Sequence, residues 1–266
     1  MSEIRINNTE IFYVKEGQGD EVVVMSHGLL WSHKMFMDQI DQLKKQYTVI
    51  AYDHRGQGQS EVSAGNYTID LLTEDAKALI EALTDKPVHF VGLSMGGFVG
   101  MRLAARYPHL IKSLILMETS ANPEPVENLP KYRFLNGIVK YFGVLPVVAN
   151  SVMKIMFAES WLKKSQNQPL VKKWSKELQS NKKTITKSVE AVLYRKGIED
   201  EIRHIKCPAM IIVGDEDVAT KPEKAKFIQM AIPNAVLHML PGAGHSSSIE
   251  KPEEVNRLLE QWLENF

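Results

Sequence analysis

The sequence predicts a doubly wound α/β fold with a mostly parallel sheet and one helical insertion. Three observations support this prediction. Short unbroken apolar runs recur along the chain, amphipathic helical patterns separate them, and this alternation breaks once, between about Asn122 and Gly197. Unbroken apolar runs are typical of strands buried on both faces of a parallel sheet, and the order strand, helix, strand favours a doubly wound arrangement. The 266 residues fit one large α/β domain that carries an insertion.

The predicted strands and helices alternate in chain order. One helix is expected over residues 72–83 and another over residues 255–263, because apolar residues recur there at the spacing of one helix face. The apolar runs that predict strands are residues 22–25, 49–52, 88–91, 114–117, 210–213 and 236–240.

The insertion is predicted to be helical throughout. Pro123, Pro125 and Pro130 lead into roughly 70 residues that show only helical spacing. We therefore divide the chain into a core domain, residues 1–121 and 198–266, and a helical cap, residues 122–197. Residues 122–200 contain 14 Lys and Arg against 7 Asp and Glu. This excess favours a solvated, lysine-rich outer face over a membrane-binding or anion-binding lid.

The composition argues against several classes of protein. Lys plus Arg and Asp plus Glu both total 32, so no net charge attracts the chain to nucleic acid or anionic lipid. The single cysteine, Cys207, can form no internal disulfide, and the first residues show no secretory signal. No apolar run approaches the roughly 18 residues of a membrane-spanning helix. We therefore expect a cytoplasmic enzyme.

Ser94 is the candidate nucleophile. It lies in Gly92-Leu-Ser94-Met-Gly96-Gly97, between the predicted strand at residues 88–91 and a helical stretch that Pro108 ends. A serine between glycines at a sharp strand-to-helix turn is typical of a nucleophile elbow. The glycines give room where side chains would clash, and the helix directs free backbone N–H groups at the site.

A serine nucleophile needs a base that an acid orients, and both candidates follow later strands. Gly214-Asp-Glu-Asp217 comes after the run at residues 210–213, and His245 follows the run at residues 236–240. The carboxyl ends of parallel strands form the edge at which open α/β sheets bind ligands. Asp215, Glu216 and Asp217 are all candidates for the acid, and Glu118 follows another predicted strand.

Two backbone amides are candidates for an oxyanion hole. Met95 follows the nucleophile directly, so its position predicts one donor. Leu29 lies in Ser26-His-Gly28-Leu29, after the first apolar run, where Gly28 allows the backbone to approach the substrate. We therefore predict Leu29 and Met95 as the two donors.

The chain resembles the α/β-hydrolase superfamily, within it the group of esterases, enol-lactonases and cofactor-free haloperoxidases. The matching segments are Ser-His-Gly-Leu at 26–29, Asp-His-Arg-Gly-Gln-Gly-Gln-Ser at 53–60, Gly-Leu-Ser-Met-Gly-Gly at 92–97, Gly-Asp-Glu-Asp at 214–217 and Gly-Ala-Gly-His at 242–245. The resemblance implies a sheet of about eight strands with a helical cap between two late strands. It also implies a catalytic triad of Ser94, Asp217 and His245, with Asp217 preferred over the other acids.

The predicted activity is hydrolysis of a small to medium apolar carboxylic ester or lactone through an acyl-enzyme intermediate. Hydrolysis of a carbon–carbon bond in a dienoate or diketone is the alternative, and a third reading is a ligand receptor of the same fold with slow turnover. Aromatic residues near the cap suggest an apolar pocket. The residues expected in the pocket are Trp31, His33, Phe142, Phe157 and Trp161.

No cofactor or metal is expected. The sequence shows neither a Cys and His cluster at ligand spacing nor a dinucleotide-binding fingerprint. The expected partner is the small-molecule substrate alone, with no nucleic acid and no membrane span, and the oligomeric state is left open.

Overall fold

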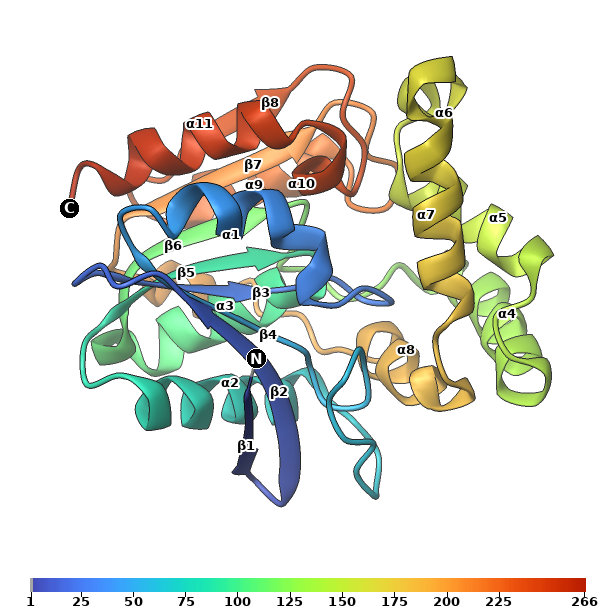
Figure 1. Cartoon of the computed structure of the whole chain (residues 1–266), viewed down its shortest axis with the longest axis horizontal. Coiled ribbons are helices and arrows are strands. Elements are labelled where there is room, and N and C mark those ends of the chain that lie inside the picture. Colours follow the sequence, from blue (N-terminus) through green and yellow to red (C-terminus); the bar gives the residue numbers. More distant parts are fainter. Residues whose placement is uncertain (1) are drawn as a thin grey trace.

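Eight strands form one twisted sheet in the computed structural model, which describes residues 2–266 (Figure 1). The strand order is β1-β2-β4-β3-β5-β6-β7-β8. The β1·β2 and β2·β4 pairs are antiparallel, and the five neighbouring pairs from β4·β3 to β7·β8 are parallel. This confirms the predicted fold class. The strands are β1 (Ser2–Ile6), β2 (Thr9–Glu16), β3 (Val22–Ser26), β4 (Thr48–Tyr52), β5 (Val88–Leu93), β6 (Ile111–Met117), β7 (Ala209–Gly214) and β8 (Val236–Leu240).

The six strands predicted from apolar runs are the six parallel ones. Every residue of β3, β4, β5 and β7 is buried, as expected for strands covered on both faces. The strands β1 and β2, which form a hairpin at the edge of the sheet, were not predicted from the sequence. Their polar and apolar residues are mixed, because one side of an edge hairpin meets solvent.

Helices cover both faces of the sheet (Figure 1). Successive residues of a strand contribute to the cores on opposite faces. Phe90 packs in the core under one set of helices, whereas its neighbour Val91 packs in the core under the other. On one face lie α2 (Ile69–Leu83), α3 (Met95–Arg106) and α9 (Pro222–Ala231). On the other lie α1 (Met37–Leu43), α10 (Ser247–Glu250) and α11 (Pro252–Leu263).

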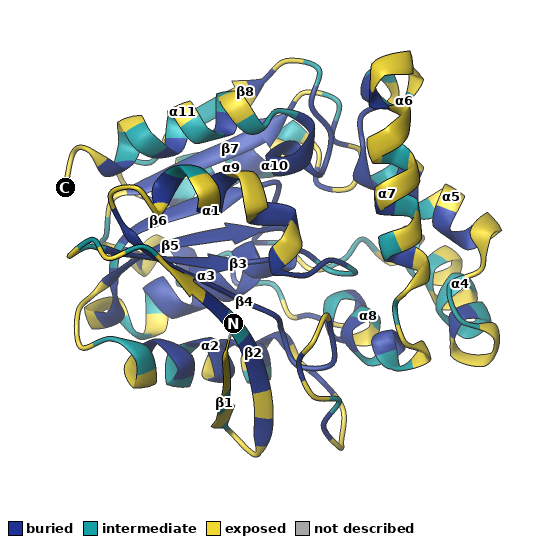
Figure 2. Cartoon of the chain, viewed as in Figure 1, coloured by how far each residue is buried: buried dark blue, intermediate teal, exposed yellow. Residues whose placement is uncertain are grey.

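Residues 122–197, the cap, follow β6 and precede β7. All of them are described, and they form helices linked by short 3₁₀ turns, with no strand. In Figure 1 the cap lies beside the sheet, and Figure 2 shows exposed outer faces on its helices. No helix within residues 2–266 combines the length and apolar character needed to cross a bilayer. The cap helices are α4 (Leu129–Phe142), α5 (Pro146–Met156), α6 (Glu159–Lys163), α7 (Gln168–Gln179) and α8 (Thr186–Leu193).

Candidate active site

Ser94 occupies the sharp turn between β5 and α3. Its φ of 53° lies in a region that residues other than glycine rarely adopt. The Ser94 N–H donates to the Met117 carbonyl at 2.8 Å, and the Thr119 hydroxyl donates to the Ser94 carbonyl at 2.8 Å. A Cβ at Gly96 would collide with the carbonyl of Ser26, so the helix packs this closely only with glycine there. The strained turn is therefore held from several sides.

His245 connects the Ser94 hydroxyl to Asp217. Its Nε2 lies 2.8 Å from Ser94 Oγ, and its Nδ1 lies 2.8 Å from Asp217 Oδ2. An ionised carboxylate can only accept, so Nδ1 carries the proton and the Nε2 lone pair faces the serine hydroxyl. Asp217 follows β7 and His245 follows β8, so adjacent parallel strands deliver both to one edge of the sheet. The arrangement can take a proton from Ser94 and store the resulting charge beside a carboxylate.

Asp217 is buried but remains a good partner for an imidazolium. Its Oδ1 accepts from the backbone N–H of Ala219 at 2.8 Å and of Thr220 at 3.0 Å, and its Oδ2 accepts from the Thr220 hydroxyl at 2.8 Å. Burial acts to raise the pKa of Asp217. The charge of His245, together with the hydrogen bonds from His245 and Thr220, outweighs burial and lowers this pKa below its ordinary value.

The other candidate acids make no hydrogen bond to His245 among residues 2–266. Asp215 accepts from the Gly242 N–H at 2.7 Å, and Glu216 accepts from the Ser160 N–H at 3.0 Å. Glu118 is fully buried, and neither of its carboxyl oxygens has a hydrogen-bond partner within residues 2–266. Burial, followed by the nearby charge of Asp217, raises the pKa of Glu118 well above its ordinary value. Of the four acids, the structure places Asp217 against His245.

Glu250, at the end of α10, holds the loop that carries His245. Its carboxylate accepts from the backbone N–H of Gly244 and Ser246, both at 3.1 Å, and of Ala158 in the cap at 2.8 Å. Burial raises the pKa of Glu250 to about 7, although these hydrogen bonds act to lower it. Glu250 therefore ties the histidine loop to the cap, a contact that the sequence analysis missed.

The amides of Leu29 and Met95 face no acceptor among the described hydrogen bonds. Met95 is the first residue of α3, where backbone N–H groups lack partners within the helix. The loop at Leu29 lies against the nucleophile turn, because a Cβ on Gly28 would lie 3.4 Å from Ser94 Cβ. Neither amide is therefore committed to an acceptor within residues 2–266.

His27 holds the loop at Gly28 and Leu29 in place through two hydrogen bonds. Its Nε2 accepts from the His54 N–H at 3.0 Å, so its Nδ1 carries the proton and donates to the Gly28 carbonyl at 2.7 Å. Burial lowers the pKa of His27, which keeps the ring neutral in this role.

Leu30 is held in an unfavourable conformation by two amide side chains. Its φ is 71°, and its N–H donates to Gln57 Oε1 at 2.9 Å. Its carbonyl accepts from Asn181 Nδ2 at 3.0 Å. Gln57 belongs to the core and Asn181 to the cap, so side chains from both parts of the chain hold Leu30, the residue after Leu29. Neither contact was predicted from the sequence: Gln57 stands in the segment 53–60, but the segment alone does not indicate which group its amide binds, and Asn181 stands in no motif.

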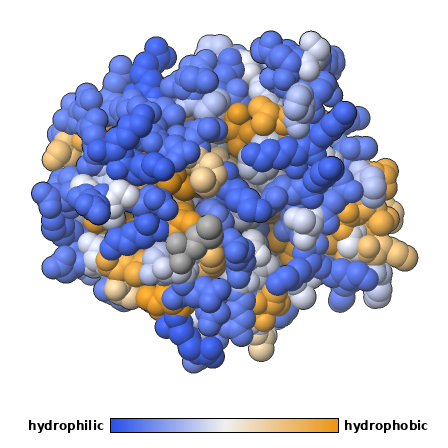
Figure 3. All heavy atoms as spheres, in the orientation of Figure 1, coloured by the Kyte–Doolittle hydropathy of each residue, from blue (hydrophilic) through white to orange (hydrophobic). Residues whose placement is uncertain are grey.

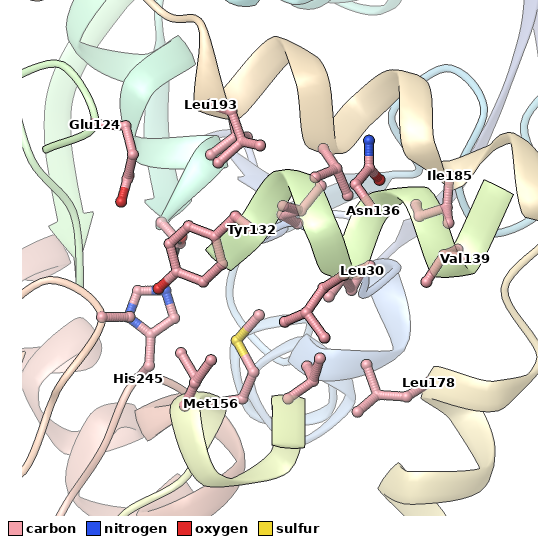
Figure 4. Close-up of a pocket in the computed structure, with 18 of the residues that line it drawn as sticks. Leu30, Glu124, Tyr132, Asn136, Val139, Met156, Leu178, Ile185, Leu193 and His245 are labelled. Atoms are coloured by element: carbon pink, nitrogen blue, oxygen red, sulfur yellow. Dashed lines mark hydrogen bonds between the residues drawn. The ribbon is translucent and has the colours of Figure 1, made fainter. Parts of the chain in front are cut away.

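Ser94 and His245 open into a cavity of about 160 Å³ between the cap and the sheet (Figure 4). Its wall is largely aliphatic and comes from α4, α5, α7 and α8 of the cap. Members of this wall include Val139, Val148, Val152, Met156, Leu178 and Ile185.

The charges at the cavity wall are paired with each other. Arg195 Nη1 lies 3.0 Å from Glu124 Oε2, and the Arg195 guanidinium lies 4.3 Å from the centre of the Phe98 ring. Burial acts to lower the pKa of Arg195, whereas the charge of Glu124 acts to raise it. Tyr132 extends from α4 in the direction of His245 (Figure 4). His245 aside, the charged residues that line the cavity, Glu124 and Arg195, form an ion pair.

The aromatic residues predicted to line the pocket lie elsewhere, which corrects that expectation. Trp31 packs edge to face on Phe157, and Phe157 stacks on Trp161 at 4.9 Å between ring centres. These three rings are buried in the core that joins cap and sheet. Packing of these rings on one another keeps them out of the cavity wall, where Phe98 and Tyr132 are the aromatic residues.

His33 and Phe142 also lie outside this wall. His33 Nδ1 is 2.9 Å from Asp53 Oδ1, and His33 and Trp31 line a separate polar pocket on the far side of Leu30. Phe142 is 68% exposed at the end of α4. The expectation that Phe142 lines the pocket is therefore corrected. Within residues 2–266, no three His, Cys, Asp or Glu side chains gather as a metal site would require.

Comparisons with known proteins identify the family of this chain. The family model described as alpha/beta hydrolase fold matches residues 21–252. The 3-oxoadipate enol-lactonase 2 of Acinetobacter baylyi is 27% identical over 255 residues, which cover 96% of this chain and 93% of that protein. The human serine hydrolase BPHL is 26% identical, over 99% of this chain and 86% of that protein.

Solved structures give the same result. The crystal structure of the enol-lactonase from Burkholderia xenovorans LB400 matches with a TM-score of 0.91 and 27% identity, covering 98% of this chain and 99% of that one. A thermophilic esterase from Thermogutta terrifontis matches with a TM-score of 0.92 and 24% identity, over 100% of this chain and 99% of that one, and supports the fold. Because the family model spans most of the chain, this protein belongs to the alpha/beta hydrolase fold family.

Proposed function

We propose that this enzyme is a serine hydrolase that cleaves a small to medium apolar carboxylic ester or lactone through an acyl-enzyme intermediate. The observation that supports it most strongly is the hydrogen-bonded chain from Ser94 through His245 to Asp217, opening into an aliphatic cavity. The relatives named as an enol-lactonase and a serine hydrolase support the same reaction class.

In the acylation step, Ser94 Oγ attacks the carbonyl carbon while His245 Nε2 takes its proton. The carbonyl oxygen becomes an oxyanion that accepts from the amides of Leu29 and Met95. A donor of this kind contributes about 3 kcal/mol in a comparable site. Asp217 stabilises the imidazolium. His245 then gives the proton to the leaving alkoxide, which departs as an alcohol and leaves the acyl group on Ser94.

Deacylation repeats these roles with water as the nucleophile. His245 takes a proton from the water, whose oxygen attacks the acyl carbon, and the same two amides bind the second oxyanion. Collapse releases the carboxylic acid and returns the proton to Ser94 Oγ. With a lactone, alcohol and acid leave as one hydroxy acid.

The cavity favours a substrate without charge on its acyl part. Aliphatic side chains surround most of the space, and the cation at its wall, Arg195, is already neutralised by Glu124. Burying a carboxylate there without a partner would be costly. A dienoate substrate for carbon–carbon hydrolysis carries such a carboxylate, so the cavity favours the ester or lactone over that alternative.

Steady-state hydrolysis of a nitrophenyl ester series of increasing acyl length, together with neutral and carboxylate-bearing lactones, tests this proposal. We expect multiple turnover on neutral substrates, an optimum at short to medium chain length, and loss of activity in Ser94→Ala. A single burst without further turnover would indicate a receptor instead, and preference for carboxylate-bearing substrates would contradict the assignment of the cavity.

A further inference from the structure

The outer face of α4 carries an exposed row of aromatic side chains. Phe134 and Tyr141 are seven residues apart, hence on the same helix face, and are 71% and 70% exposed. Large exposed residues continue along the turn into α5, with Phe142, Leu145 and Val147. Figure 3 shows apolar side chains gathered at this edge of the molecule. We call these five residues the cap ridge.

Cations flank the cap ridge, and acids are missing from it. Arg133 and Lys140 are also seven residues apart and form the neighbouring row on α4, and Lys131 lies on the other side. Residues 128–158 contain four Lys and Arg and no Asp or Glu. Exposed aromatic groups between rows of cations are the pattern of a helix that lies on a membrane surface. Exposed apolar patches of this kind mark interaction sites.

We propose that the cap ridge docks onto an anionic lipid surface. The aromatic and aliphatic side chains enter the headgroup boundary, while Lys131, Arg133 and Lys140 pair with lipid phosphates. The sequence favours a merely solvated basic face for the cap. The exposure of Phe134 and Tyr141 argues against this for α4. A helix face that only contacts water needs its cations but gains nothing from exposed aromatic rings beside them.

A second copy of the chain is a poorer occupant of this face. In a two-fold dimer the same patch meets itself, so Arg133 and Lys140 would face identical cations with no acid of residues 128–158 between them. A surface rich in phosphate supplies the missing negative charge.

The ridge adjoins the proposed active site. The opposite faces of α4 and α5 line the cavity with Val139 and Val148, so each helix has one side on the cavity and one on the outer surface. If the proposed function holds, docking brings the cap of the enzyme next to a membrane, whose lipids are themselves apolar esters. The docking itself does not depend on that function.

Flotation with vesicles of phosphatidylcholine, alone or mixed with phosphatidylglycerol, tests the proposal on the full chain. Wild type and Ser94→Ala should both bind the anionic vesicles, weakly or not at all the neutral ones, and lose binding at high salt. Reversing charge in the triple variant K131E/R133E/K140E should weaken binding by about 100-fold or more, at about 1 kcal/mol per cation. The variant F134S/Y141S/F142S should weaken binding at least about tenfold.

Three controls keep the outcomes distinct. K172E/K173E/K176E makes the same charge change on α7, and M230S removes another exposed apolar side chain, 87% exposed on α9; both should bind as wild type does. Hydrolysis of a soluble short ester should stay within about twofold in the ridge variants. Equal loss of vesicle binding in the α7 control would overturn the proposal, as would the absence of binding by catalytically active wild type. A wild-type dimer that the cap ridge variants dissociate would show that the ridge binds a second copy of the chain. Binding to polyglutamate but not to vesicles would show that the ridge binds an acidic polypeptide, and either result would overturn the proposal.

Discussion

The core and the cap each build half of the proposed active site, but by different means. In the core, Ser94, Asp217 and His245 follow the carboxyl ends of the parallel strands β5, β7 and β8 and are fixed by backbone hydrogen bonds and close glycine contacts. In the cap, helices contribute aliphatic side chains that line the cavity because they lie on the helix faces turned toward it. The core half therefore depends on individual residues, whereas the cap half depends on shape. Substitutions should separate the two halves by the size and kind of their effects.

The largest effects belong to the core. Ser94→Ala and His245→Ala should each lower kcat/KM for a preferred ester by roughly four to six orders of magnitude, because they act as one unit. The double variant should then lose little more than either single one. Additive losses in steady-state assays would show that the two residues act independently.

Asp217→Asn should lower kcat by about 10⁴-fold, because the amide favours the wrong tautomer of His245. Asp215→Asn is the matched control two residues away, where the amide oxygen can still accept from Gly242, and its kcat should stay within about threefold of wild type. If Asp215→Asn proved as damaging as Asp217→Asn, the acid would have been misassigned.

Contacts between the two halves should have intermediate effects. Gln57→Leu removes the acceptor of the Leu30 N–H, and Asn181→Leu removes the donor to the Leu30 carbonyl. Either change should leave the neighbouring Leu29 amide less firmly oriented. We expect kcat to fall about 10- to 100-fold with KM little changed, less than deletion of a whole oxyanion donor. Gln179→Leu, an exposed change near the same end of α7, should leave kcat unchanged. A change in KM alone would show that these amides shape the pocket and do not position the donor.

Within the cap, size and not identity should matter. Val152→Phe adds volume at the cavity wall and should lower kcat/KM about tenfold for long acyl chains while sparing acetyl esters. Val147→Phe, on the exposed side of the same helix, is the control for soluble substrates. Equal losses across all chain lengths would place Val152 in the catalytic step.

The smallest effect concerns stability near the site. Folding raises the pKa of Glu118, so the neutral carboxyl is favoured in the folded protein. The cost of this shift is absent below the unfolded pKa and grows as pH rises toward the folded value. Glu118→Gln mimics the neutral form. The free energy of unfolding of this variant minus that of wild type should therefore increase from about pH 5 to about pH 8. Urea denaturation at both pH values measures the difference, and a gap that narrows with pH would contradict the burial argument.

The same contrast explains what could be predicted from sequence. Buried parallel strands leave unbroken apolar runs, and a serine on a strained turn needs glycines around it, so fold class and candidate nucleophile are both visible in the chain. The edge strands β1 and β2 lack such runs. The cavity wall was missed because inward helix faces bury rings and aliphatic side chains alike. Packing alone sends Phe157 to the core and Phe142 to the surface.

The most direct test of the central claim is to trap the acyl-enzyme. Rapid quenching of wild type during turnover of a nitrophenyl ester, followed by intact mass measurement and peptide mapping, should reveal one acyl group on the peptide that contains Ser94. The adduct should be missing in Ser94→Ala under identical conditions. An acyl group on another residue, or continued turnover by Ser94→Ala, would contradict the account.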